Sequence, residues 1–186
     1  MTIVNPNHAE FKTQDAVSYN PVAQSFDRFV TQLSAPVAAR LVALAGLAPD
    51  NHVLDVGAGT GIVALRAVAE MGPSGRVVGI DLSDGMLEVA RQNARGRGLA
   101  DRVEFRKMDA ESLDCKDGSF DAVVSLFALR HFPHPETALQ EMHRVLRPGG
   151  RLVLAVGSGA PWLSLVGLVH RLKLLPHIVR RFQGKQ

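Results

Sequence analysis

An apolar run that passes directly into three glycines constrains this chain more than any other feature. The run covers residues 53–56, and the glycines occupy the alternate positions Gly57, Gly59 and Gly61. Glycine tolerates positive φ angles and lets the backbone approach a ligand without a clash from Cβ. In an open parallel sheet such a turn lies at the carboxyl edge, where ligands bind. Three glycines exceed the needs of a tight turn, so the pattern predicts a ligand site.

Short β-rich runs alternate with helical patterns along the rest of the chain. Strands are predicted at residues 52–56, 76–80, 102–106, 120–126 and 151–156, and helices near 61–71, 84–97 and 135–146. Strands rich in Val, Leu and Ile that alternate with helices indicate a parallel sheet covered on both faces. The predicted fold class is therefore α/β, with a Rossmann-like, doubly wound and mostly parallel sheet.

The spacing of the glycines discriminates between ligands. A dinucleotide-binding turn has the pattern G-x-G-x-x-G, which would require glycine where this chain has Ile62. No lysine follows as it does in a P-loop, so a triphosphate is also disfavoured. Asp55 precedes the turn, and an ionised carboxylate there would repel a phosphate but attract a sulfonium or ammonium group. The site is therefore predicted to hold a zwitterionic ligand with a positively charged group.

Two further acids follow the next predicted strands. Asp81 ends the second strand, where a carboxylate can accept both hydroxyls of a ribose. Asp109 follows the third strand and can accept a hydrogen bond from an adenine amine, while Leu82 and Met86 supply apolar surface for the ring. These features indicate a nucleoside. The alternatives are that Asp81 only caps the next helix and that Asp109 is an ordinary loop acid.

Together these segments resemble the class I methyltransferases that depend on S-adenosylmethionine (SAM), in the subgroup with ubiquinone- and menaquinone-pathway enzymes. The resemblance covers residues 52–156 through the motifs VLDVGAGTG, VVGIDLSDGMLEVAR, VEFRKMDAESL, FDAVVSLFALRHF and EMHRVLRPGGRLVLA. It implies a seven-stranded sheet of order 3-2-1-4-5-7-6 that binds SAM across its first strands. It also implies methyl transfer to a small-molecule acceptor.

The resemblance assigns roles to individual residues. It implies that the glycine turn lines the methionine and ribose, that Asp55 orients the amino group and that Asp81 holds the ribose. It further implies that Ser125 or Phe127 contacts the methionine end. The full set of implied cofactor contacts, in which Asp109 and Ala110 frame the adenine, is Tyr19, Asp55, Gly57, Ala58, Gly59, Gly61, Asp81, Leu82, Met86, Asp109, Ala110, Ser125 and Phe127.

The chain is expected to divide into three segments: an N-terminal helical lid at 1–48, a SAM-binding core at 49–160 and a basic amphipathic helix at 161–186. Within the lid, residues 1–18 are expected to be irregular and 19–48 helical, and Tyr19 and Phe26 match the aromatic residues of such lids. Only 30 residues follow position 156 and their pattern is helical. Either the sheet is abbreviated after its fifth strand or the chain is truncated.

His131 is the only candidate base near the predicted sheet edge. A lone histidine is more often a packing residue, so the favoured hypothesis is that His131 packs or caps the turn before Pro133. No catalytic base is assigned. The single cysteine, Cys115, lies in a polar loop, is expected to be exposed and offers no metal cluster. One cysteine and no signal peptide favour a reducing compartment, the cytoplasm.

Other functions remain as alternatives. The formal charge of +3 is spread along the chain, and the Pro-Pro motif of base-methylating enzymes is missing, so nucleic acid is disfavoured. An NAD-dependent oxidoreductase is disfavoured by Ile62. The basic tail is expected to pack on the sheet; the less favoured alternatives are a membrane surface and a homodimer. A SAM-binding module without turnover is the main alternative to the enzyme.

Overall fold

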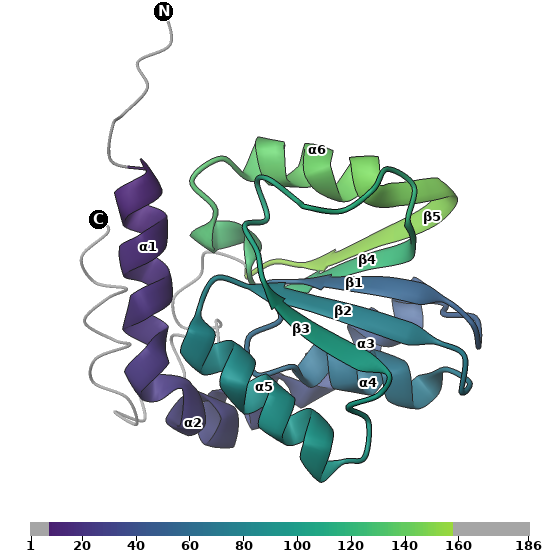
Figure 1. Ribbon diagram of the computed structural model, residues 1–186, viewed down its shortest axis with the longest axis horizontal. Helices are drawn as coiled ribbons and strands as arrows, with labels where there is room; N and C mark the ends of the chain where they lie inside the picture. Colours follow the sequence, from purple (N-terminus) through teal and green to yellow (C-terminus); the bar gives the residue numbers. More distant parts are fainter. Residues whose placement is uncertain (1–7, 158–186) are drawn as a thin grey trace, which may run out of the picture.

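A five-stranded, entirely parallel sheet forms the centre of the protein, in a computed structural model that describes residues 8–157 (Figure 1). The strands are β1 His52–Val56, β2 Arg76–Asp81, β3 Val103–Lys107, β4 Phe120–Leu126 and β5 Leu146–Ala155. They lie in the order β3-β2-β1-β4-β5. This arrangement confirms the doubly wound α/β fold, and it matches the first five strands of the order that the resemblance implied.

Strand β5 begins earlier than the sequence predicted. Phe120 of β4 pairs with Leu146, whereas Ala122 pairs with Arg151, so the register shifts between the two pairs. The extra residues of β5 include Gly149, whose φ is +80°. Pro148 and Gly149 follow the helix predicted near 135–146, and such residues are common just after a helix ends. The glycine also permits a bulge, which extends the strand back to the helix.

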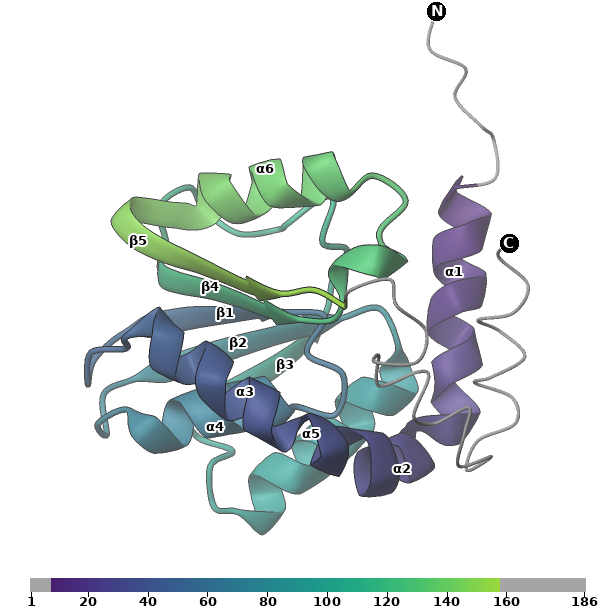
Figure 2. The ribbon, with the colours of Figure 1, turned by 180° about the vertical axis from the view of Figure 1, so that it is seen from behind.

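Helices cover both faces of the sheet (Figures 1 and 2). The helices α3 Gln32–Ala45, α4 Ile62–Glu70 and α5 Asp84–Gly96 pack on one face, and α6 Pro135–Val145 packs on the other. In β1, Val53 belongs to the first core and its neighbour Leu54 to the second, and both are fully buried. Successive strand residues face opposite sides, so a sheet covered twice requires a continuous apolar run.

The N-terminal segment differs from the prediction. Residues 8–18, expected to be irregular, belong to helix α1 His8–Tyr19. The chain then passes through short 3-10, α and π turns, η1 Asn20–Val22, α2 Ala23–Ser25 and η2 Phe26–Thr31, before α3 begins. Helix α1 buries none of its residues and stands beside the sheet, outside both helix layers (Figures 1 and 2). Its position therefore depends on polar contacts with distant residues and on Tyr19, its last residue, which packs against the buried cluster of Ala23, Met86 and Val89.

Some predictions concern residues outside the described range. The basic helix at 161–186 and its contact with the sheet or with a membrane surface lie there. Within residues 8–157, no helix has the length and apolar character needed to cross a membrane. Cys115 was expected to be exposed, but it is half-buried beside Met108, and burial raises the pKa of its thiol.

Candidate functional site at the carboxyl edge of the sheet

A cavity of about 570 Å³ opens at the carboxyl ends of the strands. Its wall is formed by the turn after β1, the ends of β2 and β3, the loop after β4 and the inner sides of α1 and η2. Of the predicted contacts, all but Gly61 and Ser125 line it. Those that do are Tyr19, Asp55, Gly57, Ala58, Gly59, Asp81, Leu82, Met86, Asp109, Ala110 and Phe127.

The three glycines of the turn all have positive φ, for different physical reasons. A Cβ on Gly57 would lie 2.2 Å from the Cβ of Ala128, so the turn and the loop after β4 are in direct contact. A Cβ on Gly61 would lie 2.8 Å from the ring of Phe105, which makes that glycine a packing residue outside the cavity wall. Around Gly59 no atom lies within 4 Å of such a Cβ. The backbone at Gly59 therefore faces open space, as a cradle for a ligand does.

Asp81 joins the end of β2 to the glycine turn. One carboxylate oxygen accepts the N–H of Gly59 at 2.9 Å, and the other accepts the N–H of Ser83 at 2.9 Å. The helix cap of α5 is Ser83, whose hydroxyl accepts the N–H of Met86, so the capping alternative for Asp81 is wrong. Burial raises the pKa of Asp81. The protein thus holds a half-buried acid in the cavity wall, with both oxygens fixed by backbone N–H groups.

Asp55 is a second acid of the wall and is more deeply buried than Asp81, with 1% of its surface exposed. One of its oxygens accepts the N–H of Ala64 in the first turn of α4, at 3.0 Å. Burial raises the pKa of Asp55 to about 7, and the charge of Asp81 adds to the shift. A positively charged ligand group would offset this penalty, because it favours the ionised form of the acid.

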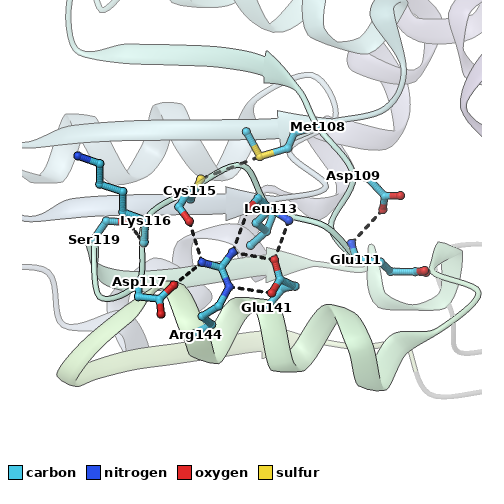
Figure 3. A network of polar contacts seen from close by, with 10 residues as sticks. All are labelled: Met108, Asp109, Glu111, Leu113, Cys115, Lys116, Asp117, Ser119, Glu141 and Arg144. Atoms are coloured by element: carbon cyan, nitrogen blue, oxygen red, sulfur yellow. Dashed lines mark hydrogen bonds and ion pairs between the residues drawn. The ribbon is translucent and has the colours of Figure 1, made fainter.

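Asp109 is held by a lysine that sequence reasoning missed. The Nζ atom of Lys12, on α1, lies 2.7 Å from a carboxylate oxygen of Asp109 and 2.6 Å from one of Glu111. The other oxygen of Asp109 accepts the N–H of Glu111 at 2.9 Å (Figure 3). Helix α1 is therefore anchored to the connection after β3 through the acid predicted to meet the adenine.

Arg144 supports the same connection from α6 (Figure 3). Its guanidinium donates to the carboxylates of Glu141 and Asp117 at 2.7 and 2.6 Å. It also donates to the carbonyl oxygens of Leu113 and Cys115, both at 2.8 Å. A planar group with five N–H donors suits such a cluster of acceptors. These bonds tie the backbone that follows Asp109 to α6 and so fix one wall of the cavity.

The loop after β4 forms the opposite wall. Phe127 has a φ of +60°, the only positive value of a non-glycine residue among those described, and it lines the cavity. Its N–H donates to the carbonyl of Ala155 at 2.8 Å, which fixes the conformation. Ser125 points elsewhere, because its hydroxyl donates to the carbonyl of Val56 at 2.7 Å. Strained backbone of this kind is concentrated at ligand sites, which supports Phe127 over Ser125.

His131, in η3 Leu129–His131, also lines the cavity. Its Nδ1 atom lies 3.2 Å from a carboxylate oxygen of Asp15 on α1, a contact that the sequence did not indicate. The ring of Tyr19 meets it edge-on, with 5.8 Å between ring centroids, and the ring of Phe26 meets Tyr19 in the same manner at 6.0 Å. The favoured hypothesis, packing or capping before Pro133, missed this pairing.

Residues 54–154, which are 101 of the 186 residues, match the family described as a methyltransferase domain. The chain belongs to the class I SAM-dependent methyltransferases. This confirms the resemblance drawn from the motifs, and the cofactor of the family is SAM. Among residues 8–157, no group of three or more His, Cys, Asp or Glu side chains is placed to hold a metal ion.

Relatives and solved structures agree with this family. The chain is 40% identical over 137 residues to a ubiquinone/menaquinone biosynthesis C-methyltransferase of Ectopseudomonas mendocina, a match that covers 73% of the chain and 54% of the relative. A SAM-dependent methyltransferase from Aquifex aeolicus is similar with a TM-score of 0.58 and 26% identity, over 63% of this chain and 62% of that one. The chain thus spans about half the length of the curated methyltransferase.

Another similar structure carries a different activity in its name. The [4+2]-cyclase SpnF matches with a TM-score of 0.71 and 28% identity, over 77% of this chain and 59% of the cyclase. The fold of this methyltransferase family is therefore compatible with more than one reaction, and function has to be argued from the site.

The residues of the cavity fit SAM. Two carboxylates, the buried Asp55 and the half-buried Asp81, suit a ligand with a cationic end and ribose hydroxyls, and the open side of Gly59 leaves room for close backbone contact. The side chains of Leu82 and Met86 line the same cavity as Asp81 and offer apolar surface of the kind that an aromatic ring can pack against. No phosphate group could be held without charge repulsion from these acids.

Proposed function

We propose that this chain binds SAM in the cavity and transfers its methyl group to a small-molecule acceptor. The observation that carries the proposal is the bond from Asp81 to the N–H of Gly59, within a segment that matches the methyltransferase family. It sets an oriented acid beside backbone that a ligand can reach. Asp81 would accept the ribose hydroxyls, Asp55 the methionine ammonium and Asp109 the adenine amine.

SAM supplies an activated methyl group when it is bound, so the chain itself has to position the reactants and exclude water. Helix α1 and η2 are suited to this task because Tyr19, Phe26 and Val30 face the cavity from the side opposite the sheet. We propose that the part of the predicted lid segment 1–48 that closes the site is α1 to η2, because α3 packs on the sheet. The acceptor in this proposal is a small molecule, as the name of the C-methyltransferase relative suggests. The proposal includes neither nucleic acid nor a second subunit as a partner of the protein.

Calorimetric titration tests the first half of this proposal. The full chain should bind SAM and its product S-adenosylhomocysteine in the micromolar range, and NAD at least about 100-fold more weakly, because the turn lacks the third glycine of a dinucleotide site. A second titration series at higher salt should leave SAM affinity nearly unchanged. Preferential binding of NAD would overturn the proposal.

A binding module without turnover is the second candidate. It is favoured by the observation that the chain covers 54% of the relative whose activity is named, and that SpnF is named as a cyclase. Incubation with methyl-labelled SAM and a panel of phenol, quinol, amine and thiol acceptors separates the two candidates. Label transfer to any acceptor supports the enzyme, whereas tight SAM binding without transfer supports the module.

A further inference from the structure

Asp15 and His131 come from distant parts of the sequence and meet in the wall of the cavity. The carboxylate of Asp15 lies 3.2 Å from Nδ1 of His131, and the side chains are 10% and 25% exposed. Both residues line the cavity. A carboxylate on Nδ1 fixes the ring orientation and keeps the Nδ1 proton in place, which leaves the Nε2 atom as the proton acceptor of the imidazole.

The sheet order locates this pair relative to the cofactor. The strands lie in the order β3-β2-β1-β4-β5, and the acids assigned to adenine and ribose, Asp109 and Asp81, follow β3 and β2. His131 follows β4, on the other side of the glycine turn after β1. His131 thus lies on the β4 side of the glycine turn, together with Phe127, and Asp15 reaches it from α1, one helical turn from the lysine that binds Asp109.

The other titratable groups of the cavity are poorly suited to accept a proton there. Lys12 is bound to two carboxylates. Burial raises the pKa of Tyr19 to about 12, so its hydroxyl keeps its proton at neutral pH. Asp55 accepts a bond from the backbone of α4 on the far side of the turn. Imidazole is the side chain that ordinarily takes up and releases protons near neutral pH.

We propose that His131 is the general base of the methyl transfer and that Asp15 is its positioning residue, an inference that rests on the proposed function. The acceptor then carries a weakly acidic hydroxyl group, as a phenol or an enol does. The proton moves from this hydroxyl to Nε2 of His131, and the electron pair stays on the acceptor, which becomes the nucleophile. His131 returns the proton to solvent after the product has left.

Several charged groups near His131 affect the pH at which its imidazole takes up a proton. Asp15 and Tyr19 face it from α1, Asp81 lies at the end of β2, and Arg130 precedes it in η3. The two carboxylates favour the imidazolium form, and the guanidinium opposes it. Asp15→Asn removes the carboxylate in contact with the ring, so the imidazole should titrate at lower pH in this variant.

The test compares His131→Asn and Asp15→Asn with His143→Asn, which changes an exposed histidine of α6. All three variants should bind S-adenosylhomocysteine within about threefold of the parent chain. The imidazole signal that disappears in His131→Asn is assigned by NMR, and its titration midpoint should fall in Asp15→Asn. Methyl transfer to phenol or catechol should drop about 10²- to 10⁴-fold in His131→Asn. In Asp15→Asn, the rising limb of the pH profile of methyl transfer should shift to lower pH, as the NMR midpoint does.

Several results would overturn the inference. Undiminished methyl transfer by His131→Asn excludes the base, and an unchanged NMR midpoint in Asp15→Asn excludes the positioning role. A parent chain that binds S-adenosylhomocysteine but methylates no hydroxyl-bearing probe contradicts the acceptor class and with it the base. Failure of the parent chain to bind S-adenosylhomocysteine is a different result, because it removes the proposed function itself.

Discussion

Asp81 holds the backbone N–H of Gly59 at 2.9 Å, so the end of β2 fixes the conformation of the turn that follows β1. The same carboxylate accepts the N–H of Ser83 at the start of α5. One side chain thus organises two strand ends and a helix start around the ligand space. Both oxygens retain lone pairs, which a ribose can use.

Asp81→Ala should weaken SAM binding by roughly 10- to 100-fold. The change removes charge-assisted hydrogen bonds worth about 1.5–3 kcal/mol and also releases the N–H of Gly59. Calorimetry with SAM measures the effect, and Asp101→Ala, at an exposed position, is the control. An unchanged dissociation constant would refute the ribose role of Asp81.

Two glycine variants should separate stability from binding. Gly57→Ala places a Cβ 2.2 Å from that of Ala128, at a φ of +72°, and should cost about 2–4 kcal/mol of unfolding free energy. Gly59→Ala meets no atom within 4 Å, at a φ of +55°, so only about 1 kcal/mol of backbone strain is expected. Its methyl group would project into the ligand space and weaken SAM binding at least tenfold. Urea denaturation measures the unfolding free energy and calorimetry the affinity for SAM. If both variants changed the two quantities to the same extent, the assignment of Gly57 to packing and of Gly59 to the ligand space would be wrong.

The affinity for SAM should rise with pH through about 7. Burial raises the pKa of Asp55 to about 7, and a bound ammonium group would lower it again, so binding releases protons in this range. Calorimetry in buffers of different ionisation enthalpy counts them. Asp55→Asn should bind SAM more weakly and without this proton release, and release that persists in the variant would assign it to another group.

The raised pKa of Asp55 also predicts how the stability of the ligand-free protein changes with pH. Its folded pKa lies above the usual value near 3.8, so the folded state binds more protons than the unfolded state between about pH 4 and 7. The contribution to stability is present at low pH and is lost as the pH rises through 7. Asp55→Asn should therefore stabilise the ligand-free chain at pH 8, on the order of 1–3 kcal/mol. Denaturation with urea at pH 5 and 8 measures this difference, and a destabilised variant at pH 8 would contradict it.

Lys12→Met should speed the exchange of S-adenosylhomocysteine by about 3- to 10-fold. The lysine binds two acids of the connection after β3, and a partly buried pair of this kind contributes roughly 1 kcal/mol. Surface plasmon resonance gives both rate constants. Lys107→Met, which removes an exposed pair with Asp84, is the matched control. Identical dissociation rates in the two variants would show that α1 does not retain the ligand.

The sequence predicted those parts of the site whose position follows from strand ends. Asp55, Asp81 and Asp109 were found because parallel strands bring their carboxyl ends to one edge, whatever the rest of the chain does. Their spacing from the predicted strands was therefore sufficient. The glycine turn was found for the same reason.

The parts that were missed depend on side-chain direction or on distant polar contacts. Gly61 lies in the predicted turn, but a Cβ placed on it would point at Phe105 in the core. Ser125 follows the predicted strand, but its hydroxyl donates to the carbonyl of Val56. Lys12 and Asp15 were missed because the half-buried face of α1 mixes charged with apolar residues, so the hydrophobic pattern carries no signal. Only the folded positions of their acidic and imidazole partners define them.

The position of Phe127 and Asp15 in the cavity wall has a consequence for how such a protein can change. Both line the cavity but belong to neither core, whereas Ala58 and Ile80 belong to the wall and to a core at once. A substitution at Phe127 or Asp15 can therefore alter which molecules enter without disturbing the packing that keeps the chain folded. A wall that can vary in this way suits a scaffold that hosts different reactions, and a structure with a similar fold is named as a cyclase.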